Sequence, residues 1–201
     1  DTFSAAMADF RTDPQGCGHV FGNPAGGFMS LACFKNGSLA RDRVRQEAGV
    51  DWAFFDAGAF EATPPGNGGM LALPWYAPEI TPPVLEPGLR ASFDFAAADP
   101  AVRVRAAVEG QILAMRLHTE WIGDFKVVRV TGGASGSPGI RQTLADVFQA
   151  RVESVAVKDS AALGGAMLAA RADGLPLAEP AVKFAPVTAV CEPRAENAAV
   201  Y

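Results

Sequence analysis

The pattern of hydrophobic and polar positions changes near residue 95. Residues 1–90 hold short apolar runs separated by turn sequences rich in Gly, Pro and Asn, which predict short strands and loops. One helix is expected in this half, with Ser38 as its N-cap and Gly49 as the residue that stops it. The first half therefore contributes few regular elements.

After residue 95 the apolar positions recur at spacings of three and four, which predicts a long amphipathic helix from about residue 98 to about 121. Strands and helices then alternate, as is typical of an α/β domain. The segment after Gly174 shows little periodicity and is expected to be loop and tail. The elements expected in between are a strand at 125–130, a helix from Ser137 and Pro138 to about 148, a strand at 152–157 and a helix at 160–171.

Composition narrows the class of protein. With 201 residues, 49% of them hydrophobic, the chain is long enough for one sizeable core, and we expect residues 1–201 to form one domain. A net charge of -5 disfavours nucleic acid as a partner. The three cysteines lack the paired spacing of a zinc or dithiol site. Neither a membrane span nor a signal peptide is apparent, so a cytoplasmic location is expected.

The sharpest local feature is the glycine-rich run Thr131–Ser137, which lies between a predicted strand and a predicted helix. Such a turn exposes backbone N–H groups beside a helix N-terminus, where anionic ligands are favoured. The run matches neither the dinucleotide fingerprint nor the Walker sequence, so a plain strand-to-helix turn remains the alternative. A dinucleotide-dependent oxidoreductase is the weaker functional interpretation, because the fingerprint spacing fails.

Several separated blocks resemble the C-terminal domain of the FGGY carbohydrate kinases, in particular their xylulokinase branch. The resemblance implies an actin-like, ribonuclease-H-like ATPase fold of the α/β class, the second of two domains that close around MgATP and a sugar. The blocks occur in the family's order and are Gly18–Pro24, Cys33–Ser38, Gly66–Gly69, Glu79–Pro82, Val104–Gln111, Gly132–Ser135, Leu144–Phe148 and Ser160–Ala166.

The resemblance also implies a function and a site. The intact kinase would phosphorylate D-xylulose to D-xylulose 5-phosphate with MgATP, and this chain would supply the nucleotide-binding half. A kinase for ribulose or another polyol, and a non-catalytic nucleotide-binding module, remain the alternatives. The implied nucleotide contacts are Gly132, Gly133, Ala134 and Ser135, with Ser137 where relatives often carry Asn, and Trp52 as a pocket aromatic.

The family's catalytic base and a phosphate-binding turn are expected upstream of Asp1. We therefore expect this chain to be a fragment that is inactive alone. Its expected partners are the N-terminal domain of the same protein, the sugar and the nucleotide. Apolar surface exposed where that domain docks is expected to favour self-association, so a homodimer is also considered.

Two carboxylates have ambiguous roles in the sequence. Glu79 is expected to form an ion pair with Arg90 or Arg105. Glu109 stands on the long helix beside Gly110, where a carboxylate close to the apolar face must be paired or must point into an interdomain cleft.

Overall fold

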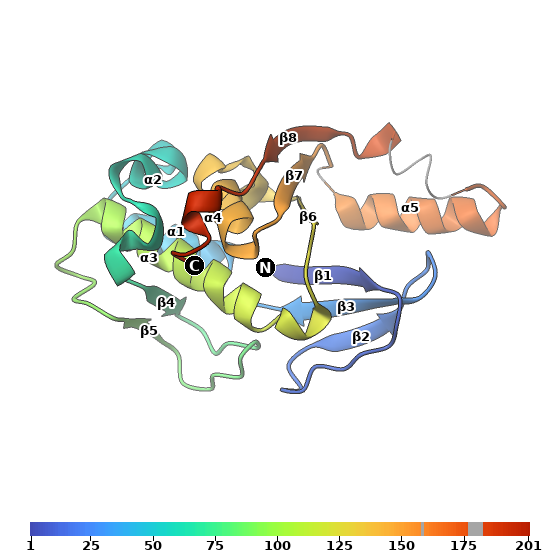
Figure 1. Ribbon diagram of the computed structural model, residues 1–201, viewed down its shortest axis with the longest axis horizontal. Helices are drawn as coiled ribbons and strands as arrows, with labels where there is room; N and C mark the ends of the chain where they lie inside the picture. The colour runs from blue at the N-terminus through green and yellow to red at the C-terminus, as the bar shows by residue number, and fades with distance from the viewer. Residues whose placement is uncertain (158, 177–182) are drawn as a thin grey trace.

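Three small β-sheets lie around a central group of helices in the computed structural model, which describes residues 1–157, 159–176 and 183–201 (Figure 1). The first sheet is antiparallel, with the order β1-β3-β2, and the second is an antiparallel pair. The third has the order β6-β7-β8, parallel between β6 and β7 and antiparallel between β7 and β8. The strands are β1 (Thr2–Met7), β2 (His19–Gly22), β3 (Phe28–Cys33), β4 (Ala72–Trp75), β5 (Gly88–Ala91), β6 (Val127–Val130), β7 (Arg151–Val155) and β8 (Val187–Cys191).

The helical elements connect these sheets and cover them. Short 3₁₀ helices lie within the loops, and one segment is a π-helix. The α-helices are α1 (Ser38–Ala48), α2 (Ala59–Ala62), α3 (Pro100–Leu117), α4 (Pro138–Phe148) and α5 (Ser160–Ala172). The π-helix is η1 (Phe54–Gly58), and the 3₁₀ turns are η2 (Pro65–Gly69), η3 (Glu120–Ile122), η4 (Gly133–Gly136) and η5 (Ala195–Asn197).

Helix α3 is the centre of the core. Its N-terminus is capped, because the Asp99 side chain accepts a hydrogen bond from Ala101 N at 2.8 Å and proline occupies the first helical position. Val104, Val108 and Ile112 are buried, and the helix packs against β4, α1, α2 and α4. The predicted helix is confirmed, but it ends at Leu117 and not near residue 121. The prediction that it is amphipathic is wrong, because residues 104–110 are buried on every side and only Leu117 is exposed.

The N-terminal half contains more helix than the sequence predicts. The expected helix at 38–48 is confirmed, and Gly49 ends it in the left-handed conformation, but its N-cap is Gly37 and Ser38 makes no capping bond. A second helical segment, η1 with α2, was missed. Asp51 caps this segment, because its side chain accepts a hydrogen bond from Phe54 N at 2.8 Å. Gly58 in the middle disfavours helix, so packing against α3 and α4 stabilises it.

The expectation of an irregular tail is wrong in part. Residues 177–182 lie outside the described residues, but 187–191 form β8, the third strand of the β6-β7-β8 sheet. The half-buried positions of β8 are Ala189 and Cys191, but the exposed positions include Val187 and Val190, so apolar and polar residues do not alternate in the sequence. Its strand conformation comes from pairing with β7, which is distant in the chain.

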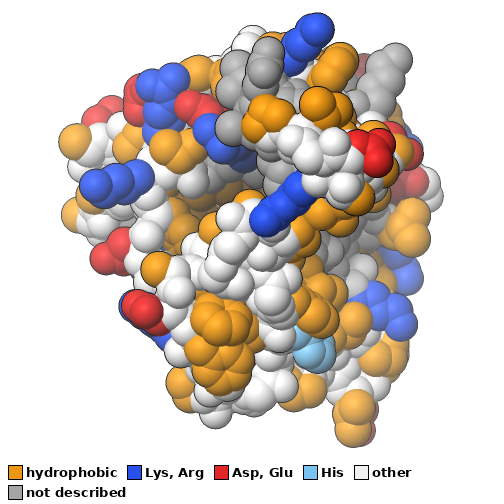
Figure 2. Space-filling view, turned by 90° about the vertical axis from the view of Figure 1, so that its right-hand side faces the viewer, with side chains coloured by type: hydrophobic (Ala, Val, Ile, Leu, Met, Phe, Trp, Pro, Cys, Tyr) orange, Lys and Arg blue, Asp and Glu red, His pale blue; other side chains and the backbone are white. Residues whose placement is uncertain are grey.

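Helix α5 extends away from the central helices toward one end of the molecule, above the β1-β3-β2 sheet (Figure 1). None of its residues is buried, although many are apolar. Viewed from that end, the molecule exposes hydrophobic side chains among scattered charges of both signs (Figure 2). No helix in the described parts of the chain is long and apolar enough to cross a bilayer.

Candidate nucleotide-binding site

The glycine-rich turn has a conformation that only glycine adopts easily at its second position. Gly132 has φ 85° and ψ -174°, and its carbonyl oxygen accepts hydrogen bonds from Ser135 N at 3.1 Å and Ser135 Oγ at 2.7 Å. A Cβ atom at Gly132, Gly133 or Gly136 would meet nothing within 4 Å. The space over the turn is therefore open to a ligand, and backbone conformation rather than crowding explains Gly132.

The far side of the turn is fixed by two polar side chains. Arg141 Nη1 donates to Ser135 O at 2.8 Å and to Gly136 O at 3.1 Å, and Ser154 Oγ donates to Ser135 O at 3.2 Å. The carbonyl groups of Ser135 and Gly136 are thus held by hydrogen bonds to neighbouring side chains of the protein. The Gly133 and Ala134 amides precede the first hydrogen bond of the 3₁₀ turn and have no partner within it. They are the backbone donors available to an anion.

Ser137 closes the turn as the N-cap of α4. Its Oγ accepts a hydrogen bond from Ile140 N at 3.3 Å and donates to Asp56 O at 3.2 Å, and the residue is only 2% exposed. The predicted cap is confirmed. The hydroxyl faces the protein interior, so Ser137 orients α4 and links it to η1.

Trp52 lies on the segment that Ser137 contacts, two residues before η1 begins. The indole is 46% exposed, packs edge-on against Phe55 with ring centroids 5.3 Å apart, and lies 4.9 Å below the Arg45 guanidinium carbon. It does not line the cavity that adjoins the glycine-rich turn. The structure thus connects the Trp52 segment to the glycine-rich turn through Asp56 and Ser137.

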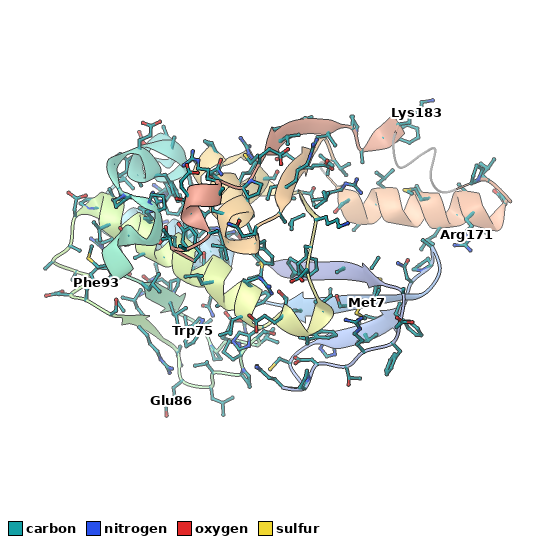
Figure 3. All side chains as sticks on the ribbon, in the orientation of Figure 1. Met7, Trp75, Glu86, Phe93, Arg171 and Lys183 are labelled. Atoms are coloured by element: carbon teal, nitrogen blue, oxygen red, sulfur yellow. The ribbon has the colours of Figure 1, made fainter. Side chains whose placement is uncertain are left out.

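A cavity of about 350 Å³ adjoins the glycine-rich turn. Ala134 and Ser135 line it, whereas Gly132, Gly133, Ser137 and Trp52 do not. Its middle is apolar, with side chains from α3 and α4, and Trp75 at the end of β4 also lines it. Trp75 is labelled near β4 in Figure 3. Its polar end holds Asp1, Asn36, Arg41 and Gln111.

The polar end of the cavity is organised by Arg41, on the buried face of α1. Its guanidinium makes a two-point ion pair with the Asp1 carboxylate, with N···O distances of 2.6 and 3.0 Å, and donates to Gln111 Oε1 at 3.2 Å. Burial lowers the pKa of Arg41 to about 10, and the charge of Asp56 opposes that shift. Arg41 therefore remains a cation at neutral pH.

Glu79 does not form the expected ion pair with Arg90 or Arg105. Its carboxylate instead accepts hydrogen bonds from the backbone N–H groups of Lys35, Asn36 and Ile80 at 2.6 to 3.0 Å, and from Asn36 Nδ2 at 2.9 Å. Burial acts to raise the pKa of Glu79, but these hydrogen bonds outweigh it and lower the pKa below its ordinary 4.5. Glu79 thus ties the start of α1 to the loop before the cis Thr81–Pro82 bond.

Replacing Glu79 with glutamine should lower the free energy of unfolding by about 2 kcal/mol at pH 7, because an amide NH₂ would face backbone donors. A carboxylate whose pKa is lowered by folding stabilises the protein above its unfolded pKa, and that contribution is lost as pH falls through the folded pKa. Urea unfolding at several pH values should therefore show the difference between the two proteins shrinking below pH 4.5. A difference that persists unchanged in acid would contradict this account.

Glu109 forms an ion pair, which is one of the two roles expected from the sequence. It is fully buried, and its Oε1 accepts from Arg105 Nε at 2.7 Å, from Gly66 N at 3.1 Å and from the Tyr201 hydroxyl.

Across the described residues, no group of three or more His, Cys, Asp or Glu side chains is placed to hold a metal ion.

Comparison with known proteins identifies the family. The model of the "FGGY family of carbohydrate kinases, C-terminal domain" matches residues 7–172. Xylulose kinase from Rattus norvegicus is 39% identical over 161 residues, which cover 74% of this chain and 29% of that protein. Xylulose kinase 2 from Arabidopsis thaliana is 33% identical over 174 residues, 76% of this chain and 31% of the relative. The chain thus spans about three tenths of these relatives' length.

Solved structures agree on the fold. A ligand-bound xylulose kinase from Lactobacillus acidophilus superposes with a TM-score of 0.86 at 20% identity, over 100% of this chain and 42% of that one. Xylulose kinase from Bifidobacterium adolescentis gives 0.80 at 25% identity, over 100% of this chain and 40% of that one. The predicted actin-like ATPase fold is confirmed. This chain belongs to the FGGY family of carbohydrate kinases and corresponds to their C-terminal domain.

Proposed function

We propose that this domain binds the nucleotide of MgATP and, within a longer kinase, serves the phosphorylation of D-xylulose to D-xylulose 5-phosphate. The observation that carries the nucleotide part is the open glycine-rich turn at the end of β6 and the start of α4. The xylulose part rests on the likeness to the rat and Arabidopsis xylulose kinases. Ribulose or another polyol is the competing substrate, because we assign no sugar contact to this chain.

In this proposal the chain binds and orients the nucleotide. The free amides of Gly133 and Ala134, together with the N-terminus of α4, attract phosphate oxygens. Gly132 and Ser135 shape the turn, Ser137 fixes the start of α4, and the exposed face of Trp52 is available for the adenosine. Mg²⁺ would be bound by the phosphate oxygens and would neutralise charge that develops during transfer. We assign no catalytic base to this chain.

Isothermal titration with ADP and Mg²⁺ tests the nucleotide part, and we expect measurable binding at millimolar nucleotide. Gly132→Ala should weaken binding about 10-fold or more, because alanine is strained at φ 85°, ψ -174° by roughly 1–3 kcal/mol and the turn must rearrange. Gly164→Ala on α5 is the matched control, since its Cβ would meet nothing within 4 Å.

The results of these titrations test nucleotide binding and its assignment to the glycine-rich turn separately. If the unaltered chain gives no heat with ADP, the nucleotide proposal fails. If it binds ADP and both variants bind equally well, the assignment to the glycine-rich turn fails. A thermal shift with NAD but not with ADP would favour the oxidoreductase alternative. Comparing ATP consumption with D-xylulose and with D-ribulose on the longer protein tests the substrate.

A further inference from the structure

Arg141 contacts the glycine-rich turn from the start of α4. Its Nη1 atom donates to Ser135 O at 2.8 Å and to Gly136 O at 3.1 Å, so one guanidinium nitrogen holds two successive carbonyl groups. Long side chains on a helix point back toward its N-terminus, and Arg141 stands four residues after the N-cap, Ser137. The position of Arg141 on α4 therefore places its guanidinium against the turn.

The charge of Arg141 is not paired as the charges of Arg41 and Arg129 are, although all three side chains line the cavity beside the turn. Arg41 pairs with Asp1 at 2.6 Å. Arg129 pairs with Glu153 at 3.1 Å. In the described part of the chain, no ion pair includes Arg141, and its Nε atom is buried without a hydrogen-bond partner. A half-buried guanidinium is costly without a counter-ion, so an anionic ligand near it is favoured.

The two hydrogen bonds from Arg141 also set the direction of the amides of the turn. The C=O and N–H groups of a trans peptide point in opposite directions, and the carbonyl groups of a 3₁₀ turn point toward its C-terminal end. The Ser135 carbonyl is held from β7 as well, because Ser154 Oγ donates to it at 3.2 Å. The Gly133 and Ala134 amides consequently point toward the opposite end of the turn from Arg141.

The turn is short enough for the charge of Arg141 to act across it. Its four residues, Gly133–Gly136, span roughly 8 Å at about 2 Å per residue. The Debye length at physiological ionic strength is also about 8 Å, so salt does not fully screen a charge over this distance. A phosphate group at the Gly133 and Ala134 amides would therefore be attracted by the guanidinium behind the turn.

We propose that Arg141 is a positioning residue for the phosphate groups of a nucleotide: it orders the glycine-rich turn through two carbonyl groups and supplies positive charge behind the turn. The inference rests on the proposed nucleotide function. A turn that is ordered before the ligand arrives loses less conformational entropy on binding, which strengthens binding. The alternative is that Arg141 only stabilises the fold, in which case folded variants should bind phosphate groups as well as the unaltered chain does.

Three variants separate these roles. Arg141→Met keeps a long unbranched side chain and removes the charge and the donors, whereas Arg141→Lys keeps a charge and three donors. Arg171→Gln is the matched control, because it removes one positive charge at the far end of α5 (Figure 3). Binding of ADP with Mg²⁺, and of pyrophosphate without metal, is measured by isothermal titration. NMR shifts of the Gly133 and Ala134 amides locate the site, and circular dichroism shows which variants are folded.

We expect Arg141→Met to weaken the binding of both ligands about 10-fold or more, and Arg141→Lys to restore part of the loss, to within about 3-fold of the unaltered chain. Arg171→Gln should bind as the unaltered chain does. If the methionine variant does not fold, the lysine variant decides, because a smaller but measurable loss is expected of it.

The two ligands distinguish failure of this inference from failure of the proposed function. Pyrophosphate binding that depends on Arg141, without any ADP binding, would support the role of Arg141 and refute the nucleotide function. ADP binding that is equal in the unaltered chain and in every folded Arg141 variant would leave the nucleotide function standing and overturn the role of Arg141. Pyrophosphate that does not shift the Gly133 and Ala134 amides of the unaltered chain would also overturn it.

Discussion

Replacing Glu109 with alanine should lower the free energy of unfolding by about 3–5 kcal/mol. Glu109 is fully buried and lies 2.7 Å from the Nε atom of Arg105, whose side chain is only 6% exposed. Removing the carboxylate leaves the guanidinium buried without a counter-ion, and leaves Gly66 N and the Tyr201 hydroxyl with one acceptor fewer. The cost of the isolated charge exceeds any gain from releasing the pair.

Urea unfolding followed by circular dichroism measures this effect. The matched control is Glu47→Ala, because Glu47 pairs with Arg43 at the same spacing of four residues but on the surface. That pair should contribute less than about 1 kcal/mol. Equal losses in the two variants would contradict the view that burial makes the Arg105–Glu109 pair indispensable.

The same substitution should change the titration of Tyr201. Burial is the larger cause that raises the pKa of Tyr201 to about 12, and the hydrogen bond to Glu109 and its negative charge are the next. Without Glu109 the pKa should fall toward the ordinary 10.0. Ultraviolet titration of the phenol, with Tyr201→Phe as the reference for assignment, reports this shift in the folded protein.

The parts of the fold that could be predicted are those with local signals. Helix α4 was placed correctly because Ser137 and Pro138 specify its start. The existence of helix α3 follows from the spacing of its apolar residues, whereas its burial on all sides does not. Strand β8 was missed because its conformation depends on β7, some thirty-five residues earlier. The hydrogen-bond donors around Glu79 were missed for a related reason, since most of them are backbone amides and the sequence does not show where those lie.

The candidate site also has a part that local sequence signals predict and a part that they do not. A glycine pair after a strand predicts the turn at Gly132 and Gly133, and the structure explains the need for glycine at Gly132 through its φ of 85°. The polar end of the cavity was not predicted. It joins Asp1 to Arg41 across 40 positions and Arg41 to Gln111 across 70, and no spacing rule relates residues so far apart. The assignment of nucleotide contacts remains a prediction that titration must test.

Replacing Gly110 with alanine should lower the free energy of unfolding by about 3 kcal/mol or more, although alanine favours helix. A Cβ atom at Gly110 would lie 2.1 Å from Ala72 O and 2.9 Å from Ala72 C, both backbone atoms of β4. A backbone atom cannot avoid the new methyl group by changing rotamer, as a side chain can, so α3 and β4 must move apart. Their separation would loosen the buried positions on both elements, Ala72 among them.

Gly165→Ala isolates that steric cost from helix propensity. Gly165 also lies inside a helix, α5, but its Cβ would meet nothing within 4 Å, so alanine should be neutral or stabilise by about 0.5–1 kcal/mol. Urea unfolding of the two variants should therefore give changes of opposite sign or very different size. A Gly110→Ala protein as stable as the Gly165→Ala protein would show that α3 and β4 have room to part, and would refute the close packing on which the central core depends.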